Sequence, residues 1–516
     1  MYFHLSYNQG QMTFQEVLDG AEVVARSGDT TVVGVDYDSR RVKPGFVFVA
    51  MRGEVSDGNR FIDAAIAAGA AAVVTDSGAE KQRPGVAWVV VEHGRRALAR
   101  LSANFYKRPA ERLAMTGITG TNGKSTTAFL VEAILSAAGR RSALLGTIEY
   151  HVAGKVLPAP HTTPEALELN QILNQALGQG ATEAVMEVSS HALAQQRVYG
   201  VPFDVAVFTN LTRDHLDYHS TMEEYLAAKS LLFEGCGTDA PRAAVINTDD
   251  EQGAELARRS RKRSELVLAY GWERGDFHAK NVEVETSGSR FDMVTPEGTI
   301  SIFSRMIGRV NVYNILAAAA AAQARGCKLD EIARGVRGLA CVPGRFERVD
   351  CGQPFSVVVD YAHTDDALRN LTSLARGFVS RSAPHGRVIT VFGCGGDRDR
   401  AKRPLMGEAA GKGSDFVVLT SDNPRSEDPL AIINDSLVGM QKTGTQYSVE
   451  PDRRKAIALA IGEARPGDIV LLAGKGHEKT QTSRDGVRPF DDVEAAREEL
   501  RTAGFECAPA STGAAQ

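Results

Sequence analysis

Short apolar runs, each bounded by glycine, proline or polar turn residues, recur along most of the chain. In the first 110 residues these runs are rich in β-branched and aromatic residues, and they predict strands at 31–35, 46–51, 71–75 and 87–91. Further along, stretches with helical spacing of apolar residues lie between such runs. Because strands that alternate with helices build sheets covered by helices, the pattern predicts an α/β protein.

This alternation continues in two further blocks. The first predicts a mainly parallel sheet, with strands at 113–118, 143–146, 183–188, 205–209 and 243–247. Pro343 and Gly344 then interrupt a helical pattern, and a second α/β unit follows. Its predicted strands lie at 356–359, 387–392, 416–420 and 469–473. We therefore expect three domains, a small N-terminal one at 1–110, a central one at 111–342 and a Rossmann-like one at 343–516.

Composition agrees with a multidomain globular protein. The 516 residues are too many for one core, and 43% of them are apolar and 24% charged. A formal charge of −5 gives no electrostatic reason to expect binding to nucleic acid or to a membrane surface. Residues 1–11 do not resemble a signal peptide, and the alanine-rich run at 316–324 is too short to span a bilayer. We therefore expect a cytoplasmic protein.

The six cysteines indicate no special chemistry. They are scattered without C-x-x-C pairs, at Cys236, Cys327, Cys341, Cys351, Cys394 and Cys507. This spacing suggests neither a zinc site nor a disulfide framework.

The most informative segment joins the predicted strand at 113–118 to a helical pattern at 126–138. Gly117, Gly120 and Gly123 stand at three-residue spacing, and Lys124 and Ser125 follow. Glycines let the backbone approach an anion, successive N–H groups point at its oxygens, and the helix N-terminus adds a positive dipole. In such a P-loop, Lys124 reaches the β- and γ-phosphates and Ser125 binds Mg²⁺. The central domain is therefore predicted to resemble a P-loop ATPase.

Gly117 lies one residue further from the Gly-Lys pair than in the usual P-loop spacing. Two interpretations remain open at this point. One is an ATP-dependent ligase that forms an amide, and the other is a P-loop ATPase without synthetic chemistry.

Other polar residues follow predicted strands of the same sheet. Glu187 ends an apolar run, where a second Mg²⁺ ligand is expected beside a P-loop. The loop at 209–219 carries two histidines, of which His215 is the better candidate metal ligand and His219 the weaker. Lys229 falls on a helix that begins near Thr221, where the sequence alone predicts a surface lysine.

Four polar loops follow the predicted strands of the C-terminal unit, at 360–363, 392–399, 420–425 and 473–478. In open α/β sheets, ligands bind at the carboxyl ends of the strands. The loops carry the charged residues Arg398, Asp422, Arg425 and Glu478. Arginine suits a carboxylate and Asp or Glu suits an ammonium group, so these loops predict a site for a zwitterion.

Many motifs occur in an order that resembles the Mur ligases along essentially the whole chain. In chain order they are DSR with PG, GTNGKST, TTP, MEVSSHAL, FTNLTRDHLDYH, the segment 308–314, GRFE, DYAH, FGCGGDRD, DNPR and GKGHE. The resemblance implies a monomeric enzyme that uses ATP and Mg²⁺ and joins a carboxylate to an amine through an acyl phosphate. It implies addition of meso-diaminopimelate to UDP-N-acetylmuramoyl-L-alanyl-D-glutamate. An L-lysine-adding ligase is the alternative within the family.

The resemblance also assigns roles to individual residues. The ATP-binding positions it implies are Gly117, Thr119, Gly120, Thr121, Asn122, Gly123, Lys124, Ser125, Thr126, Asn311 and Arg345. The positions implied for the UDP substrate are Tyr37, Ser39, Glu54, Val55 and Ser56 in the N-terminal domain, and Thr162, Thr163, Ser189, Gln195 and Arg197 in the central one. Those implied for diaminopimelate are Arg398, Asp422, Asn423, Pro424, Arg425, Gly474 and Glu478.

The implied catalytic set is Lys124, Glu187, His215 and Lys229, and the implied metal ligands are Ser125, Glu187, His215 and Lys229. In the family, the lysine that Lys229 matches is carried as a carbamate (N6-carboxylysine). One departure is Asp365, which stands where the family usually has proline after DYAHT. Aspartate is acceptable in a first helical turn, so we expect little consequence.

Overall fold

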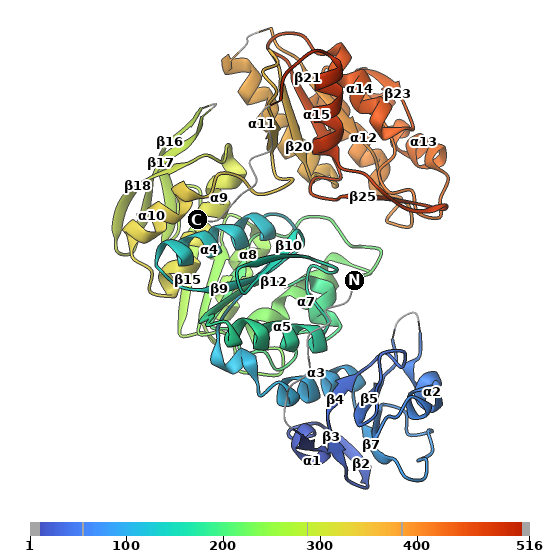
Figure 1. The fold of residues 1–516 in the computed structure, drawn as a ribbon. Coiled ribbons are helices and arrows are strands. Elements are labelled where there is room, and N and C mark those ends of the chain that lie inside the picture. The colour runs from blue at the N-terminus through green and yellow to red at the C-terminus, as the bar shows by residue number, and fades with distance from the viewer. Residues whose placement is uncertain (1–10, 54–55, 286, 383–384, 508–516) are drawn as a thin grey trace.

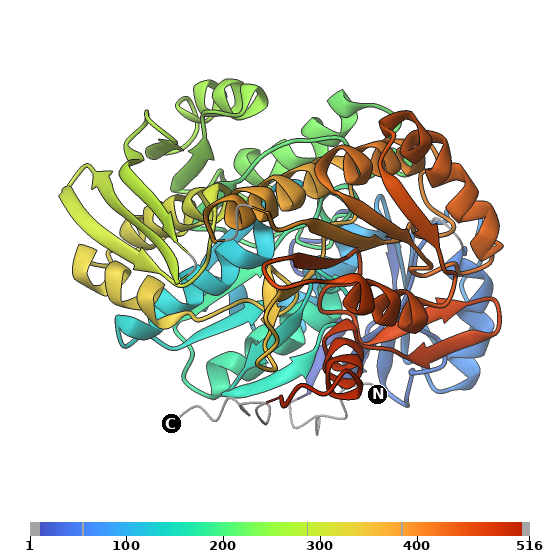
Figure 2. The ribbon, with the colours of Figure 1, turned by 90° about the horizontal axis from the view of Figure 1, so that it is seen from above.

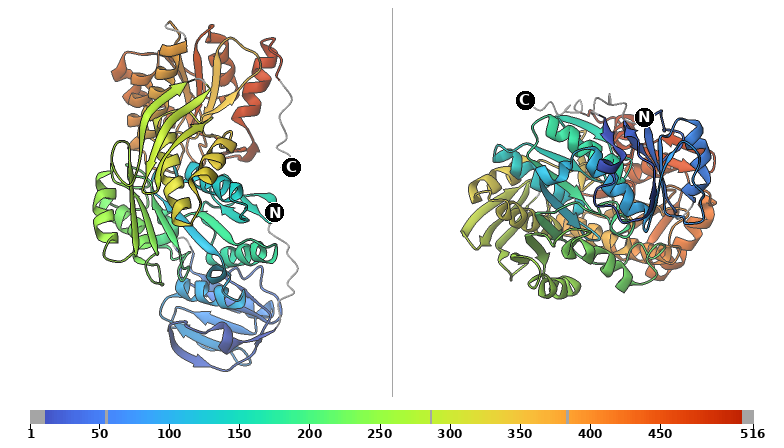
Figure 3. Two further views of the ribbon diagram at one scale, coloured as in Figure 1. Left: turned by 90° about the vertical axis from the view of Figure 1, so that its left-hand side faces the viewer. Right: turned by 90° about the horizontal axis from the view of Figure 1, so that it is seen from below.

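The computed structural model describes residues 11–53, 56–285, 287–382 and 385–507. Three main sheets follow one another along the chain, and each forms its own cores with the helices around it. Figure 1 and the left view of Figure 3 show them in a row, with the N-terminal sheet at one end and the C-terminal sheet at the other. The α/β class predicted from the sequence is confirmed.

The N-terminal sheet has five strands in the order β2-β7-β6-β5-β4. Their bounds are β2 Val23–Ser27, β4 Gly34–Asp36, β5 Phe46–Ala50, β6 Ala72–Thr75 and β7 Ala87–Val91. A separate pair is formed by β1 (Met12–Thr13) and β3 (Thr31–Val32), and the helices are α1 Phe14–Val17, α2 Ile62–Ala67 and α3 Gly94–Phe105. The strand predicted at 31–35 is therefore two strands, because Val33 leaves the ladder and its N–H donates to the Gly45 carbonyl.

The central sheet has eleven strands in the order β11-β10-β9-β12-β8-β13-β14-β15-β16-β17-β18. Their bounds are β8 Ala114–Thr119, β9 Ser142–Leu145, β10 Glu149–Val152, β11 Lys155–Pro158, β12 Glu183–Glu187, β13 Val205–Phe208, β14 Ala243–Asn247, β15 Leu266–Gly271, β16 Phe277–Glu285, β17 Gly288–Thr295 and β18 Gly298–Ser304. The strands from β9 to β16 in that order run parallel. This confirms the predicted parallel core.

Both edges of this sheet are antiparallel, which the sequence analysis did not predict. The hairpin β10–β11 extends one edge, and β17 and β18 extend the other. Much of β16 and β18 is exposed or half-buried, so these strands lack the continuous apolar run that marks the parallel core.

Helices cover both faces of the central sheet. Their bounds are α4 Lys124–Ala137, α5 Ala166–Gly178, α6 Ser190–Ala194, α7 Met222–Glu234, α8 Glu251–Ser260, α9 Arg309–Ala324 and α10 Leu329–Gly338. α4, α9 and α10 pack on one face, and α5, α7 and α8 on the other. The alanine-rich part of α9 is fully buried, because its small side chains let the helix lie close to the sheet and to α4. Within the described ranges, no helix is both long and apolar enough to cross a membrane.

The C-terminal sheet has six strands in the order β19-β20-β24-β21-β22-β23, and only β19 is antiparallel to its neighbour. The bounds are β19 Glu347–Val349, β20 Ser356–Asp360, β21 Val388–Phe392, β22 Phe416–Leu419, β23 Gln446–Val449 and β24 Ile469–Ala473, with a hairpin of β25 Thr480–Ser483 and β26 Gly486–Pro489. α11 (Asp365–Ser382), α12 (Lys402–Gly413) and α13 (Pro429–Met440) cover one face, and α14 (Arg453–Glu463) and α15 (Asp492–Thr502) the other, as Figure 2 shows from above.

A disulfide joins Cys351 to Cys507, across 156 residues of sequence. The spacing of the cysteines did not predict this bond, since no local pattern pairs these two residues. The fold brings them together because α15 packs against β19 and β20, which places the segment after the helix beside the turn between those strands. Cys236, Cys327, Cys341 and Cys394 are free.

A charged cluster at the edge of the central sheet makes one prediction about stability. The two ring nitrogens of His151 lie 2.7 Å from Glu132 Oε2 and 2.9 Å from Glu149 Oε1. Burial by itself favours the neutral ring, but hydrogen bonds from the two carboxylates outweigh it and raise the pKa of His151 from 6.5 to about 9. The cluster therefore stabilises the fold fully below pH 6.5, and its contribution is lost as the pH rises through 9.

His151→Gln is accordingly expected to lower the thermal unfolding midpoint of the protein at pH 6 but not at pH 9.5, by an amount equivalent to at most about 3 kcal/mol. Comparing the variant with the parent at each pH removes the effect of other titrating groups. A difference of equal size at both values would contradict this assignment.

Candidate active site

The P-loop lies at the centre of the middle sheet, where β8 ends between β12 and β13. Gly120 and Gly123 adopt φ values of 145° and 88°, which residues with a side chain rarely adopt. A Cβ on Gly123 would lie 2.4 Å from Asn314 Oδ1. α4 begins at the next residue, Lys124, so its N-terminus points at the loop. The local structure is that of a phosphate cradle.

A cavity of about 720 Å³ opens at this end of the sheet, between the central and C-terminal domains. It brings together residues that the sequence analysis drew from distant segments. From the predicted set, Thr121 to Thr126, Thr162, Thr163, Glu187, Ser189, Arg197, His215, Asn311, Arg345 and Arg398 line it. Gly117, Thr119 and Gly120 form the strand end and loop beneath these residues.

Two lysines share one carbonyl under the cavity. Lys124 Nζ donates to Gly120 O at 3.0 Å and to Thr121 O at 2.8 Å, and Lys229 Nζ donates to Gly120 O at 2.9 Å. Lys229 is 1% exposed, and its amine also lies 4.3 Å from the centre of the Tyr225 ring. Burial, reinforced for Lys229 by Lys124, lowers the pKa of both amines. The prediction that Lys229 lies on the surface is wrong, because α7 turns this residue toward the P-loop.

Glu187 and Ser125 provide oxygen ligands to the cavity. The Glu187 carboxylate accepts hydrogen bonds from the backbone N–H of Thr147 at 2.7 Å and from its hydroxyl at 3.0 Å. Ser125 Oγ accepts from the Arg345 guanidinium at 3.2 Å, across the boundary between the central and C-terminal domains. Arg345 also lies over the Tyr361 ring, 4.7 Å from its centre. Hydrogen bonds from neighbouring residues thus hold both of these candidate metal-binding oxygens in place.

The loop after β13 contacts the C-terminal domain through Asp214. Its carboxylate lies 3.5 Å from His215 Nε2, 3.8 Å from His363 Nε2 and 3.8 Å from Lys402 Nζ. Burial opposes ionisation of Asp214, but its interactions with His215, His363 and Lys402 and a hydrogen bond from the His215 backbone N–H outweigh it and lower its pKa. Burial lowers the pKa of His215, which keeps its ring neutral and available as a ligand. His219 lies apart, with its Nε2 2.9 Å from Ser190 Oγ.

One wall of the cavity contains most of the central-domain residues that were predicted to bind the UDP substrate. Thr163 Oγ1 donates to Glu187 O at 2.9 Å, and its own oxygen accepts from the Ser189 N–H at 3.0 Å. Arg197 donates to Thr163 O at 3.0 Å and to Gln195 Oε1 at 2.7 Å. Gln195 therefore stands behind Arg197 and does not line the cavity.

The N-terminal positions predicted for UDP that the structure describes lie away from this cavity. The Tyr37 hydroxyl donates to Glu168 of α5 at 3.2 Å, so this residue lies at the junction of the first two domains. Ser39 and Ser56 are on loops that do not line the cavity, and Glu54 and Val55 lie outside the described residues.

The four C-terminal loops share one edge, because β20, β24, β21 and β22 are parallel neighbours. A Cβ on Gly395 would lie 3.0 Å from the Arg425 guanidinium and 3.7 Å from Arg398 Cγ, so the two arginines flank the same point. Arg425 NH1 donates to Gly396 O at 2.7 Å. A Cβ on Gly474 would lie 2.7 Å from Asp422 Oδ2. Of the residues predicted for the amino acid, only Arg398 lines the cavity, and the others lie on the neighbouring loops at the same edge of the C-terminal sheet.

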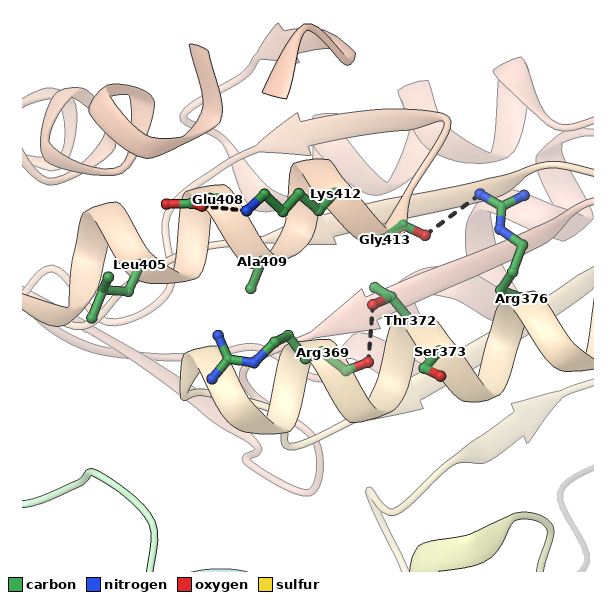
Figure 4. Close-up of a pocket in the computed structure, with 9 residues that line it drawn as sticks. All are labelled: Arg369, Thr372, Ser373, Arg376, Leu405, Glu408, Ala409, Lys412 and Gly413. Atoms are coloured by element: carbon green, nitrogen blue, oxygen red, sulfur yellow. Dashed lines mark hydrogen bonds and ion pairs between the residues drawn. The ribbon is translucent and has the colours of Figure 1, made fainter. Parts of the chain in front are cut away.

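A second hollow, of about 480 Å³, lies on the C-terminal domain between α11 and α12 (Figure 4). Its cations are already paired. Lys412 lies 2.5 Å from Glu408, Arg376 lies 2.7 Å from Asp415, and Arg369 lies 2.6 Å from Asp365. These pairs leave the hollow without an uncompensated charge, and we assign it no ligand.

Sequence reasoning missed several residues of the site. Thr147, which holds Glu187, comes from the loop after β9, and Asp366, which accepts from the Asn122 side chain at 3.1 Å, comes from α11. Asp214 lies in the loop at 209–219 that was noted for its two histidines, but its partners His363 and Lys402 belong to another domain. Such contacts leave no local signal in the sequence.

Comparison with known proteins agrees with this arrangement. Three family profiles match the chain, described as the Mur ligase family catalytic domain at residues 31–106, the Mur ligase middle domain at 118–322 and the Mur ligase glutamate ligase domain at 344–476.

Individual relatives match over nearly the full length. The chain is 56% identical over 478 residues to the UDP-N-acetylmuramoyl-L-alanyl-D-glutamate–2,6-diaminopimelate ligase of Solibacter usitatus, covering 92% of this chain and 95% of that protein. It is 45% identical over 479 residues to the ligase of the same name from Geobacillus thermodenitrificans, covering 92% and 96%. A solved structure of a ligase of that name is 34% identical, with a TM-score of 0.67, and covers 96% of this chain and 100% of that one. The chain therefore belongs to the Mur ligase family.

Proposed function

We propose that the protein uses ATP to join meso-diaminopimelate to the D-glutamyl γ-carboxylate of UDP-N-acetylmuramoyl-L-alanyl-D-glutamate. One observation carries the proposal. A single cavity is lined by the P-loop, by the polar wall at Thr162, Thr163 and Arg197, and by Arg398 of the C-terminal domain. Three reactants can meet there, which a plain ATPase would not require. The names of the full-length relatives support the choice of substrates.

In the first step, the γ-carboxylate attacks the γ-phosphorus of ATP, and an acyl phosphate and ADP form. Lys124 offsets the charge on the transferring phosphoryl group, and the P-loop N–H groups and the N-terminus of α4 bind the phosphates. Thr163 and Arg197 lie where they can orient the carboxylate against this group.

The donor groups at the cavity fit Mg²⁺. Ser125 and Glu187 supply oxygen, and His215 and a carbamylated Lys229 would complete the set. Among the described residues, no group of three or more His, Cys, Asp or Glu side chains that could hold a metal ion occurs. The proposed ion would therefore take its remaining ligands from substrate phosphates and water. When bound, Mg²⁺ would neutralise charge on the phosphates.

In the second step, the amine of the incoming amino acid attacks the acyl carbon and loses a proton. The tetrahedral intermediate then expels inorganic phosphate and leaves the amide. No side-chain nucleophile is needed, so the positioning of the three substrates supplies most of the rate enhancement. Contacts of Asp214 with His363 and Lys402, and of Arg345 with Ser125, hold the C-terminal domain against the central one, which keeps the substrates of the two domains close together.

The C-terminal loops have charges of both signs, which suits an amino acid. Arg398 and Arg425 flank Gly395 and can receive carboxylates, while Asp422 and Glu478 can receive an ammonium group. Diaminopimelate has one more carboxylate than L-lysine, and Arg425 is the proposed partner of that group.

The test is tripeptide formation with meso-diaminopimelate, L-lysine or L-ornithine, measured beside phosphate release. We expect phosphate release only when both the UDP-dipeptide and a diamino acid are present, and product chiefly with diaminopimelate. Rapid hydrolysis of ATP alone, unaffected by either substrate, would instead identify a plain ATPase. A preference for L-lysine would identify the alternative ligase.

A further inference from the structure

Lys475 is a fully buried lysine in the loop after β24, between Gly474 and Glu478 of the proposed amino-acid site. Its side chain is 0% exposed. Nζ donates to Glu478 Oε2 at 3.0 Å and to Asn423 Oδ1 at 3.3 Å. Asn423 in turn donates from Nδ2 to Glu478 Oε2 at 2.8 Å. The three side chains therefore form a closed triangle between the two loops that carry most of the proposed amino-acid contacts.

The backbone around Lys475 allows little freedom. Gly474 and Gly476 on either side adopt φ values of 112° and 52°. A Cβ on Gly474 would lie 2.7 Å from Asp422 Oδ2, and one on Gly476 would lie 2.7 Å from Tyr361 Cβ. The loop thus packs directly against its neighbours, which turns the intervening lysine inward.

A second buried cation, Arg453, lies close to the triangle of Lys475, Asn423 and Glu478. Arg453 is paired through two hydrogen bonds of 2.7 Å with Asp492, and it donates to Ala473 O at 3.0 Å and to Ser421 O at 3.4 Å. Those carbonyls immediately precede Gly474 and Asp422. Lys475 and Arg453 therefore lie beneath these loops together with the carboxyl groups of Asp422, Glu478 and Asp492.

We propose that Lys475 is the positioning residue of the amino-acid pocket. It binds one oxygen of Glu478 together with Asn423, which fixes the carboxylate so that its other oxygen, Oε1, is presented to the ammonium group of the substrate. Removing the lysine ammonium group from water costs free energy, and the hydrogen bonds to Glu478 and Asn423 offset that cost only in this arrangement. The inference rests on the function proposed above.

The test is Lys475→Met, which keeps the length of the side chain and removes its charge. Loss of a charged hydrogen-bond partner is expected to raise KM for diaminopimelate about 10- to 100-fold, while KM for ATP and for the UDP-dipeptide stays within about twofold. The matched control is Asp468→Asn. Asp468 is also buried and ion-paired, with Arg387 at 2.8 Å, but it precedes β24 whereas Lys475 follows it. The control is expected to leave KM for diaminopimelate unchanged.

A double-mutant cycle separates positioning from general stability. If Lys475 acts through Glu478, then Lys475→Met in a Glu478→Gln background should add less than about twofold to the loss caused by Glu478→Gln alone. If Lys475 merely supports the fold, the two losses multiply, and the positioning role is overturned. Should Lys475→Met fail to fold, Lys475→Gln, which keeps a neutral donor, decides the same question in the same cycle.

The parent enzyme in the same assay distinguishes two kinds of failure. If it forms no tripeptide from diaminopimelate, the proposed function itself fails. If it forms tripeptide, and Lys475→Met changes KM for diaminopimelate no more than Asp468→Asn does, only the inference about Lys475 is overturned.

Discussion

Lys229→Ala is expected to lose nearly all ligase activity, by about 10²- to 10³-fold or more in kcat. The reason is the shared carbonyl under the P-loop. Lys124 and Lys229 both donate to Gly120 O, so two ammonium groups would meet at one point, where Lys229 is removed from solvent. Like charges so close to each other are unfavourable when one of them is buried. Conversion of Lys229 to a carbamate would remove this repulsion and would supply an anionic oxygen ligand for Mg²⁺.

Rescue by small molecules makes this prediction specific. Short carboxylates such as acetate or propionate are expected to restore part of the activity of Lys229→Ala, because they can fill the vacated space with an anion. The matched control is Lys412→Ala, which removes a lysine that is 68% exposed on α12 and is expected to keep full activity. Near-normal turnover of Lys229→Ala without any additive would show that neither the amine nor its carbamate takes part.

Arg425→Ala is expected to raise KM for meso-diaminopimelate by about 10³-fold and to leave KM for ATP nearly unchanged. Arg425 has a φ of 51°, and its guanidinium donates to Gly396 O, so the residue is held over the loop that carries Arg398. A distal carboxylate would pair with this cation. L-Lysine lacks that carboxylate and would leave the guanidinium unpaired, which is why the parent enzyme should use lysine poorly.

The control for Arg425 is Arg400→Ala. Arg400 follows the loop that carries Arg398, but it is 68% exposed and pairs with Asp435 on the surface. Its loss should therefore not affect binding of the amino acid. Two results would contradict the role of Arg425, namely a parent enzyme that prefers L-lysine and an Arg425→Ala variant with an unchanged KM. Either could occur in an enzyme that is still an amide ligase.

Several features could be predicted from the sequence because neighbouring residues produce them. The glycine spacing, the Lys-Ser pair and the helical pattern after it are contiguous, and the structure has β8, the loop and α4 in that order. The parallel core of the central sheet could also be predicted, since strands buried on both faces are continuously apolar. The four loops of the C-terminal domain followed from the same reasoning, because parallel strands end at one edge.

The tertiary structure alone decided what depends on contacts between distant segments. Lys229 is buried because α7 turns it toward the Gly120 carbonyl, 109 residues away in the sequence. Lys475 is buried because its loop packs against that of Asn423, 52 residues away, and its amine donates to the Asn423 amide oxygen. Cys351 and Cys507 are joined because α15 packs against β19 and β20. The antiparallel strands at the edges of the central sheet have one solvated side and hence a weak apolar pattern. A motif made of adjacent residues can be recognised in the sequence. The burial of a side chain and the partners that it contacts depend on how the whole chain packs.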